Sequence, residues 1–574
     1  MYCWVGWVCN ASSVYDTAVL RTITVSVMVI LEARHIQSHK LAPWGLVFIF
    51  VALVVFFDPV WQTNDDVAMS QIVHGYGISF KPMPHLVFSN ILWGWLLYLM
   101  PTVGGLLPYS YMTLAIILFS ALAILACLRK MGCPSLLAVL SLSIVLADAI
   151  AFPQFTKVSG LATVAGVFAC YVYLIKKDGA SLIIGWILLF LGNLIRSKEL
   201  ILVLAIAVPV FPWRSIIYDR RFIIAATLLV FAISSAKMFD DFSYSGDTWR
   251  DFKSFNPIRL KFTDYQLGGY FARYPDIAAA HGFSQNDLAL ISSWFFVDPK
   301  IADPARISAL LETVDWKELW RMNLTTGVTS IYRIFDPSLL PLIVPALLIC
   351  AISPARRRLV LAIAIFIAAA FLLGLQGRPG PSRVFYPIAC LLFISPLLMG
   401  FNQNRAYCGK VLCFPNSDFG QRTRLLYFVL AMCAVWAIAY QGRKINSLHD
   451  QSLAAQAEIS QLDSSHLYVF WGADFPRELA YPVIDLDEEK RRIRIFGLGV
   501  FSLAPFASGQ WLNTPWSSFR HGLLEGDPIP VAASDAKLAL LREHCRAHYD
   551  RAMRIVREEQ KSILRVTYLT CSND

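Results

Sequence analysis

Long apolar runs are the feature that most limits what this chain can fold into. Many of them reach 16 to 20 residues, close to the roughly 20 that a helix needs to cross the bilayer core. Lipid offers no partner to a backbone N–H or C=O group, and these runs are too long and too continuous for barrel strands. Charged residues make up only 16% of the chain, against about 25% in soluble domains. The sequence therefore predicts an all-α polytopic membrane protein.

We predict about eleven transmembrane helices from these runs. Their ranges are 41–57, 109–128, 134–152, 160–175, 180–195, 199–213, 222–238, 337–353, 359–375, 385–400 and 425–440.

The orientation follows from the basic residues between the runs. The segment 86–107 is apolar but is interrupted by Pro101 and a Gly-Gly pair. If it does not cross, the basic clusters all fall on one side, which is the cytoplasm by the positive-inside rule. We therefore expect 86–107 not to cross, and we take the net charge of +10 as a sign of orientation, with no nucleic-acid partner. The clustered residues are Arg34, Lys40, Arg129, Lys130, Lys176, Lys177, Arg214, Arg220, Arg221, Arg356, Arg357, Arg358, Arg405, Lys410, Arg422 and Arg424.

This orientation divides the chain into three parts. Residues 1–40 are predicted to be cytoplasmic, with 1–27 either disordered or an over-long start. Residues 41–440 are the transmembrane domain, with extracytoplasmic loops 58–108 and 239–336. Within the second loop, 239–322 is expected to form short helices packed on the membrane surface. Residues 441–574 form a small mixed α/β extracytoplasmic domain.

Two stretches of the C-terminal domain indicate its secondary structure. "HLYVFWG" is typical of a strand, and "DAKLALLREHCRAHYDRAMRIVREEQ" predicts an exposed helix with charges at helical spacing. Cys545 and Cys571 can form a disulfide if this domain is extracytoplasmic.

Charged side chains gather on the predicted outer face. Asp65 and Asp66 follow directly on the first apolar run, in "WQTNDDVAMSQIVHGYG". Ionisable groups near a membrane are costly and are often functional. The others at span ends on this face are His74, His85, Lys157, Arg196, Lys198, Glu199, Arg378 and Arg383.

Carboxylates and cations together on one membrane face suit the transfer of a sugar from a lipid phosphate. A carboxylate can accept the proton of the attacking hydroxyl as a general base. Cations can stabilise the charge that grows on the departing phosphate, and the planar fork of arginine binds phosphate oxygens bidentately.

The plan resembles the GT-C superfamily of polyprenyl-phosphate-dependent integral membrane glycosyltransferases. Its members have an acidic pair in the first extracytoplasmic loop, here "TNDD", followed by a proline-containing stretch, here "KPMPHLVFSNILWGWLLYLMP". The chain reads PMPH where several members have HPP, which leaves the role of His85 open.

The resemblance implies an inverting glycosyltransferase of the bacterial inner membrane, working in glycan biosynthesis of the cell envelope. Its donor would be a polyprenyl-phosphate-linked sugar, and its acceptor a glycan, lipid or protein outside the cytoplasm. Asp65 or Asp66 would be the base. The phosphate would be held by Arg196, Lys198, Arg378, Arg383 and Lys157, and the substrate contacted by His74, His85 and Glu199.

Several alternatives stay open from the sequence. Asp65 and Asp66 also fit the first turn of a helix capped by Thr63 or Asn64. Successive helical residues point about 100° apart, so we favour Asp65 as the base and Asp66 as an orienting group. No spacing demands a metal, although a divalent ion near the two carboxylates stays open. The competing functions are an O-antigen-type polymerase or ligase and a lipid-linked glycan transporter or flippase.

Overall fold

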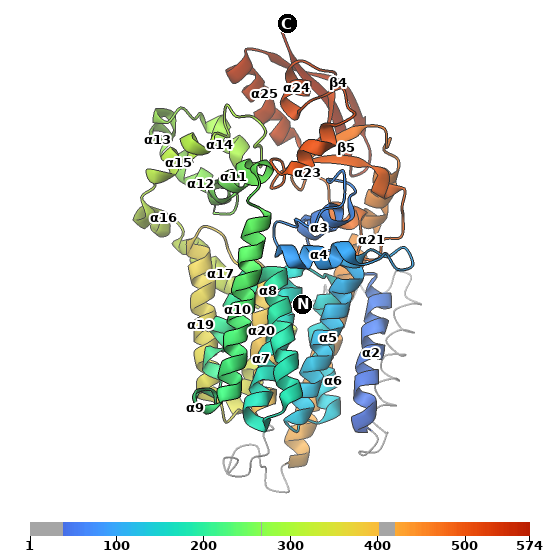
Figure 1. The fold of residues 1–574 in the computed structure, drawn as a ribbon, viewed down its shortest axis with the longest axis vertical. Helices are drawn as coiled ribbons and strands as arrows, with labels where there is room; N and C mark the ends of the chain where they lie inside the picture. The colour runs from blue at the N-terminus through green and yellow to red at the C-terminus, as the bar shows by residue number, and fades with distance from the viewer. Residues whose placement is uncertain (1–37, 266, 401–418, 574) are drawn as a thin grey trace, which may run out of the picture.

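The protein is a bundle of long apolar helices that carries two smaller bodies at one end (Figure 1). The computed structural model describes residues 38–265, 267–400 and 419–573. The predicted segment 1–27 and the basic residues Arg34, Arg405 and Lys410 lie outside them. The bundle helices are α2 (Ser38–Phe57), α5 (Pro108–Lys130), α6 (Ser135–Ala151), α7 (Phe155–Lys176), α8 (Gly179–Ala207), α10 (Arg220–Ser243), α18 (Leu340–Ile352), α19 (Arg356–Leu375), α20 (Ser382–Gly400) and α21 (Phe419–Ser460). Short segments between α8 and α10 are η1 (Val208–Val210) and α9 (Trp213–Tyr218).

Seven helices in the described residues are long and apolar enough to cross a membrane, or eight if one bent pair counts as a single span. Each of the eleven predicted segments overlaps a helix, but the count of eleven is not confirmed. The apolar parts of α2 and α6 are short, at Leu41–Phe57 and Ser135–Ala151. The bent pair joins Leu324–Phe335 to α18 at an angle of 84°, and the predicted segments 180–195 and 199–213 both fall within α8.

Helix α8 reverses direction at Arg196, whose backbone is extended at φ −160° and ψ 98°. Asp178, just before α8, pairs with Lys130. Asp219, which ends the segment formed by α8, η1 and α9, pairs with Lys177 at 2.5 Å. Both ends of the segment therefore lie at the same end of the bundle, and Arg196 lies at the other end.

The outer faces of the bundle are apolar. Helix α10 exposes Ile223, Leu228 and Phe231, and α19 and α21 expose Val360 and Phe428. In contrast, α7 and α20 are almost wholly buried. Exposed apolar surface on this scale marks contact with lipid, so α10, α19 and α21 face the membrane, while α7 and α20, together with the equally buried α6, form the centre of the bundle.

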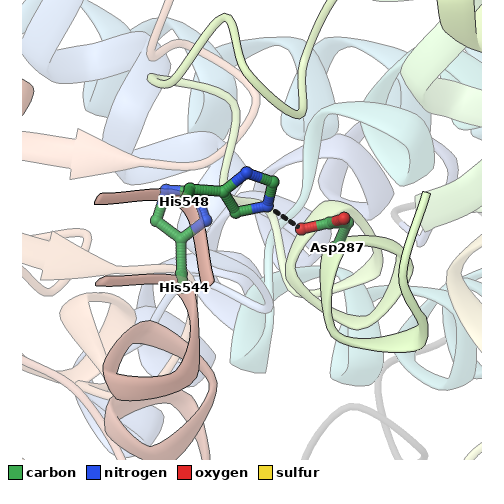
Figure 2. A group of neighbouring side chains, drawn as sticks. All are labelled: Asp287, His544 and His548. Atoms are coloured by element: carbon green, nitrogen blue, oxygen red, sulfur yellow. Dashed lines mark hydrogen bonds and ion pairs between the residues drawn. The ribbon is translucent and has the colours of Figure 1, made fainter. Parts of the chain in front are cut away.

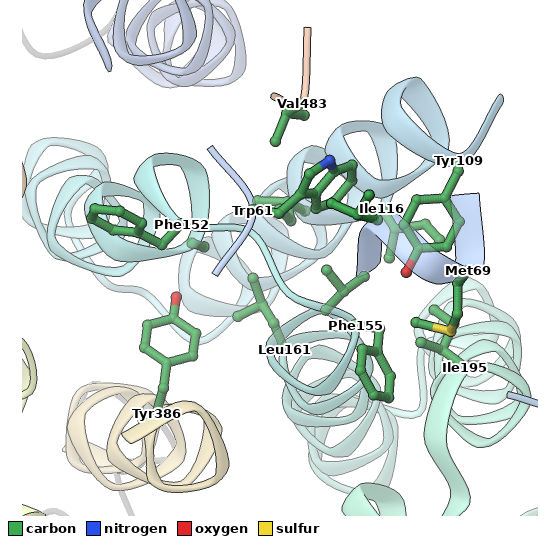
Figure 3. Close-up of a cluster of buried hydrophobic side chains, with 14 of the residues drawn as sticks. Trp61, Met69, Tyr109, Ile116, Phe152, Phe155, Leu161, Ile195, Tyr386 and Val483 are labelled. Carbon is green, nitrogen blue, oxygen red and sulfur yellow. The ribbon is translucent and has the colours of Figure 1, made fainter. Parts of the chain in front are cut away.

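A buried apolar cluster closes the upper end of this centre. Trp61, Tyr109, Phe155 and Ile195 meet there from four segments (Figure 3). The Trp61 and Tyr109 rings lie 5.3 Å apart. This packing fixes the start of α3 against α5 and α7.

Two short helices lie above the bundle, α3 (Asn64–His74) and α4 (Ile91–Leu99). Helix α4 has nine residues, about 13.5 Å at 1.5 Å per residue, which is too short to cross a bilayer core of about 30 Å. The Asn90 side chain caps it by accepting from the N–H of Leu92 at 3.0 Å. Helix α4 by itself therefore does not span, and the topology of 86–107 stays a prediction.

The segment 247–322 forms the first of the two bodies, here called the outer helical region. Its core contains Phe262, Phe271, Leu288 and Leu310. It consists of short helices, as expected. Its helices are α11 (Asp247–Thr263), α12 (Leu267–Arg273), α13 (Pro275–Ala280), α14 (Gln285–Ser292), α15 (Pro304–Glu312) and α16 (Trp316–Met322), and α17 (Leu324–Tyr332) and η2 (Arg333–Phe335) lead back to the bundle.

The outer helical region packs against the C-terminal domain, a contact that the sequence did not predict. Trp471 donates through its indole N–H to the carbonyl of Ser293 at 2.6 Å. The side chain of Asn286 donates to the carbonyl of Leu540 at 3.1 Å. The two bodies therefore form one cap over the bundle (Figure 1).

The C-terminal domain is a small mixed α/β unit, as predicted. Its five-stranded sheet has the order β2-β1-β3-β5-β4. Strand β1 runs parallel to β2 and β3, and β5 runs antiparallel to β3 and β4. The elements are β1 (Leu467–Trp471), α22 (Arg477–Ala480), η3 (Lys490–Arg492), β2 (Arg494–Leu498), α23 (Pro505–Ser508), η4 (Gly509–Trp511), α24 (Phe519–Leu524), β3 (Ile529–Ala532), α25 (Asp535–Tyr549), β4 (Ala552–Gln560) and β5 (Arg565–Ser572).

The predicted long exposed helix after residue 534 is half wrong. It stops at Tyr549 because Asp550 takes a left-handed conformation with φ 52°. The following residues form β4, whose backbone groups pair with β5. Cys545 and Cys571 form a disulfide that ties α25 to β5.

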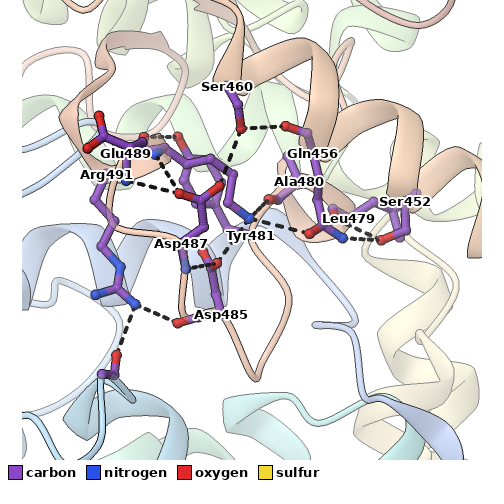
Figure 4. A network of polar contacts seen from close by, with 12 residues as sticks. Ser452, Gln456, Ser460, Leu479, Ala480, Tyr481, Asp485, Asp487, Glu489 and Arg491 are labelled. Carbon is purple, nitrogen blue, oxygen red and sulfur yellow. Dashed lines mark hydrogen bonds and ion pairs between the residues drawn. The ribbon is translucent and has the colours of Figure 1, made fainter.

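The C-terminal domain is also anchored to the helices beneath it. Helix α21 continues through the predicted boundary at 441 and ends at Ser460. Lys490 pairs with Asp485 at 3.0 Å, and Arg491 donates to the carbonyl of Gly105 at 3.1 Å. Figure 4 shows this network between α21 and the loop that precedes β2.

The predicted orientation can be tested with single cysteines at exposed positions. We expect Asp276→Cys and Glu488→Cys to react with a membrane-impermeant thiol reagent on intact cells, because both lie in the cap. Arg214→Cys, at the opposite end of the bundle, should react only after permeabilisation. The chain without an added cysteine is the control. Protection of positions 276 and 488 in intact cells would reverse the orientation.

Candidate active site

Helix α3 presents the acidic pair in its first turn, directly above the bundle. Thr63 precedes it with extended backbone, and Gly75 ends it at φ 73°. The Thr63 hydroxyl donates to Asp66 at 3.1 Å and does not cap the helix. The Asn64 side chain accepts from the N–H of Glu478 at 3.1 Å. The capping roles considered for Thr63 and Asn64 are thus replaced by contacts with Asp66 and α22.

Asp66 is a buried anchor. Its carboxylate accepts hydrogen bonds from the Tyr109 hydroxyl at 3.0 Å and from the N–H of Phe155 at 2.9 Å, besides that of Thr63. Burial raises the pKa of Asp66 to about 7, and the Asp65 charge adds to this, while the hydrogen bonds oppose it. The side chain joins α3 to α5 and α7 and is closed to a substrate.

Asp65 instead lines a pocket of about 170 Å³ between α3 and the cap. Loops that follow β1 and β2 line its far wall. In open sheets with parallel strands, ligands bind beyond the carboxyl ends of the strands. The lining residues are Asn64, Asp65, Ala68, Ile78, Trp294, Gly472, Ala473, Arg477, Gly497, Leu498, Gly499, Val500 and Phe501.

Two arginines of the bundle converge on the acidic pair. Arg196 lies at the reversal of α8, and Arg383 lies in the first turn of α20. Each interacts electrostatically with Asp65 and Asp66. Arg196 also packs over the Phe155 ring, 4.7 Å from its centroid.

Two further arginines, in the cap, lie within electrostatic range of Asp65. Arg259 of α11 and Arg477 of α22 each interact electrostatically with it. Arg259 is held by Asn256 at 2.8 Å and lies over the Trp294 ring, 5.2 Å from its centroid. Trp294 takes φ 73°, which is strained for a bulky side chain, and such strain gathers at ligand sites.

Arg477 is the most informative of the four. It is only 8% exposed, and within the described structure its Nε and Nη1 atoms are buried without a hydrogen-bond partner. Burial lowers its pKa, and Glu478 opposes the shift. Unpaired buried donors are costly, so an anion in the pocket would satisfy them.

Three of the cations that were predicted to bind the donor phosphate have other surroundings. Lys157 is buried and pairs with Asp148 at 2.6 Å, while its ammonium also donates to the carbonyl of Phe152 at 3.0 Å. Its ammonium thus has partners within the bundle, and the prediction that it holds a phosphate stays a prediction. Arg378 pairs with Asp264 at 2.9 Å, and Lys198 is exposed.

The other predicted side chains serve the fold around the site. His74 accepts from the N–H of Tyr109 at 3.3 Å, and burial lowers its pKa to about 4. His85 lies 3.3 Å from the carbonyl of Ser243 and stacks on Trp249. Glu199 is buried beside Arg196, which it attracts.

The sequence did not single out Arg259 or Arg477. Both belong to regions rich in charge, and neither lies at the end of an apolar run. Their approach to Asp65 depends on how the cap docks, through contacts such as Asn64 with Glu478, and no local pattern encodes that contact.

Comparisons with known proteins give limited matches. No family model matches the chain, and no curated protein does. Among solved structures, ArnT from Cupriavidus metallidurans in the apo state matches with 12% identity and a TM-score of 0.36, over 92% of this chain and 97% of that chain. The same protein bound to undecaprenyl phosphate matches with 13% identity and a TM-score of 0.34, over 92% and 98%.

The buried state of Asp66 predicts a pH-dependent stability. Its folded-state pKa of about 7 lies above the ordinary 3.8, so the folded chain holds a proton that the unfolded chain releases. This contribution is present at low pH and is lost as the pH rises through about 7. In Asp66→Asn the amide is neutral throughout, so the contribution disappears.

Thermal unfolding in detergent at about pH 5 and about pH 8 measures this effect. We expect the midpoint of the wild type to fall more between these values than that of Asp66→Asn. Asp58→Asn, an exposed change in the loop that precedes α3, should show the same fall of the midpoint as the wild type. An equal fall of the midpoint in all three proteins would contradict the buried, protonated state of Asp66.

Proposed function

We propose that the protein is a membrane glycosyltransferase that moves a sugar from a polyprenyl-phosphate donor to an extracytoplasmic acceptor. The acceptor is a hydroxyl of a glycan, a lipid or a protein. Asp65 is the general base, and the arginines around it bind the donor phosphate.

One observation carries this proposal. Asp65 lines a pocket at the end of the bundle and interacts with four arginines, of which Arg477 has buried guanidinium nitrogens without a partner. Asp65 is the one acidic residue that lines the pocket, while the other carboxyl groups near these arginines, Asp66, Glu199 and Glu478, are partly or wholly buried beside it. The arginines suit an anionic ligand, and the Asp65 carboxylate suits a step that removes a proton.

The roles follow from these charges. Asp65 accepts the proton of the acceptor hydroxyl as its oxygen attacks the anomeric carbon. The bond from that carbon to the phosphate oxygen breaks, and the polyprenyl phosphate leaves with the bonding electrons. Arg383, Arg196 and Arg477 stabilise the charge that develops on this phosphate. Asp66 fixes the helix that carries the base and takes no proton from the substrate.

The bundle contains a candidate position for the lipid tail. An apolar pocket of about 60 Å³ lies between the bent pair and α19, lined by Ile334, Ile343, Phe366 and Leu392 among others. Phe366 packs on Phe385 with ring centroids 5.4 Å apart, two residues from Arg383. A polyprenyl chain could therefore run from this pocket to a phosphate at Arg383.

The cap is proposed to be extracytoplasmic. The Cys545–Cys571 disulfide supports this side, since disulfides persist in oxidising compartments. The one-sided basic loops support it independently.

A second candidate is an O-antigen-type polymerase or ligase. The arginines that the cap supplies, Arg259 and Arg477, favour it, because such an enzyme would rely on outer arginines. It differs in one respect that can be measured, since it would not need Asp65.

Replacing Asp65 separates these functions. Loss of a general base costs about 10²–10⁴ in rate, so we expect Asp65→Asn to lose at least a hundredfold in donor consumption. The assay incubates the purified protein with a panel of polyprenyl-phosphate sugars. Asp58→Asn, in the loop that precedes α3 and outside the pocket, should keep full turnover.

Full turnover of Asp65→Asn with the donor that the wild type consumes would favour the polymerase or ligase. If the wild type consumes no donor in the panel, the glycosyltransferase proposal fails.

Replacing Arg477 tests the phosphate contact. Arg477→Lys keeps the charge but loses the planar fork, and loss of one preorganised donor costs about 10²–10³ in turnover. We expect a loss of that size in kcat. Arg492→Lys, an exposed change in the same domain, is the matched control. Equal losses in the two variants would remove Arg477 from the site.

A further inference from the structure

A second cluster of chemically active side chains lies within the cap, where the C-terminal domain meets the outer helical region. His544 and His548 stand one turn apart on α25, and Asp287 faces them from α14 (Figure 2). One ligand atom of each residue lies within 4.8 Å of the others. Two histidines four residues apart on one helix face are a known metal-binding arrangement.

The surroundings of His544 leave one ring nitrogen free. Its Nε2 atom lies 2.8 Å from the carboxylate of Asp298, which also accepts from the Tyr549 hydroxyl at 2.5 Å. Asp298 thus favours the tautomer with the proton on Nε2. The Nδ1 atom is buried and has no hydrogen-bond partner among the described residues, and His544 is wholly buried.

Asp287 and His548 complete a set of ligands. The Nε2 atom of His548 lies 2.7 Å from one oxygen of Asp287. The other oxygen of Asp287 accepts from the N–H of Ser284 at 2.9 Å, within the capping box of α14. Asp287 is therefore fixed in place, while the His548 side chain is 22% exposed and leaves a path for an ion.

We propose that His544, His548 and Asp287 bind a divalent transition metal of the zinc class. His544 would coordinate through Nδ1, with Asp298 orienting its ring from the other nitrogen. A carboxylate behind a ligating histidine is the usual support of such sites. Solvent beside His548 would supply the fourth position of a tetrahedral ion.

The chemistry of the ligands selects the metal. Imidazole suits zinc and its neighbours, whereas calcium and magnesium prefer oxygen ligands alone. Asp287 and Asp298 offset the charge of a divalent cation. Metal–ligand bonds of about 2 Å place two ligands at most about 4 Å apart. The His548 and Asp287 atoms, 2.7 Å apart, already lie within this distance, so only the wider separations, of up to 4.8 Å, need to shorten.

The metal would join two parts of the chain that both shape the Asp65 pocket. Helix α14 ends two residues before Trp294, which lines that pocket. Helix α25 is tied to β5 through Cys545, the neighbour of His544. The site would therefore hold the Trp294 wall against the C-terminal domain. The proposal does not depend on the glycosyltransferase function.

Metal analysis of the full-length protein tests the site. The protein is purified in detergent, stripped with a chelator, dialysed and supplied with one equivalent of Zn²⁺. We expect about one tightly held zinc per chain, and at least tenfold weaker binding in His548→Ala and in Asp287→Asn. The matched control is His466→Ala, which removes another histidine paired with an aspartate, Asp463, but with no third ligand.

Two further measurements keep the result independent of how well a variant folds. Co²⁺ bound to the wild type should give visible d–d bands of a nitrogen and oxygen site, without a thiolate charge-transfer band. Zn²⁺ should raise the thermal midpoint of the wild type and of His466→Ala, since a ligand that binds only the folded state stabilises it. Failure of the wild type to hold zinc, equal binding in all variants, or a thiolate band would each overturn the proposal.

Discussion

The buried carboxylate of Asp66 is the contact on which the arrangement of the candidate site depends. Three donors from Thr63, Tyr109 and Phe155 fix it, and they join the start of α3 to α5 and α7. Consecutive helical side chains point about 100° apart, so fixing Asp66 inward turns Asp65 out toward the cap. An adjacent pair of identical residues is in this way divided into an anchor and a pocket residue by their surroundings alone.

The charges around Asp65 come from segments far apart in the chain. Arg196 is delivered by the reversal of α8, Arg383 by the start of α20, and Arg259 and Arg477 by the two bodies of the cap. Each guanidinium is partly or wholly withdrawn from water, where electrostatic interactions are stronger than in solvent. The pocket therefore exists as an anion site only when bundle and cap are assembled, and this links the stability of the cap contacts to the chemistry of the site.

Particular residues show where sequence reasoning succeeded. Helical geometry predicted that Asp65 and Asp66 point in different directions, and in the structure Asp65 lines the pocket while Asp66 is buried; the role of Asp65 as the base stays a prediction. Arg196 stood out because charge interrupted two apolar runs. Lys157 stood out as a charged residue at a span end, but the sequence did not show its buried partner Asp148, which belongs to another helix. An unpaired cation at a span end and one half of a buried ion pair look alike in a sequence, since burial and partners depend on packing.

The sequence by itself determined that the chain is helical within a membrane, where the acidic pair lies relative to the first helix, and that a mixed α/β domain follows the bundle. Hydrophobic length and backbone hydrogen bonding decide these properties locally. Only the tertiary structure decided that β4 replaces the second half of a predicted helix, that Arg477 lies buried beside Asp65, and that His544 and His548 meet Asp287. Burial and ligand geometry bring Arg477 and His544 to partners hundreds of positions away, and no local spacing specifies such contacts. Strand β4 forms because its backbone pairs with the neighbouring β5.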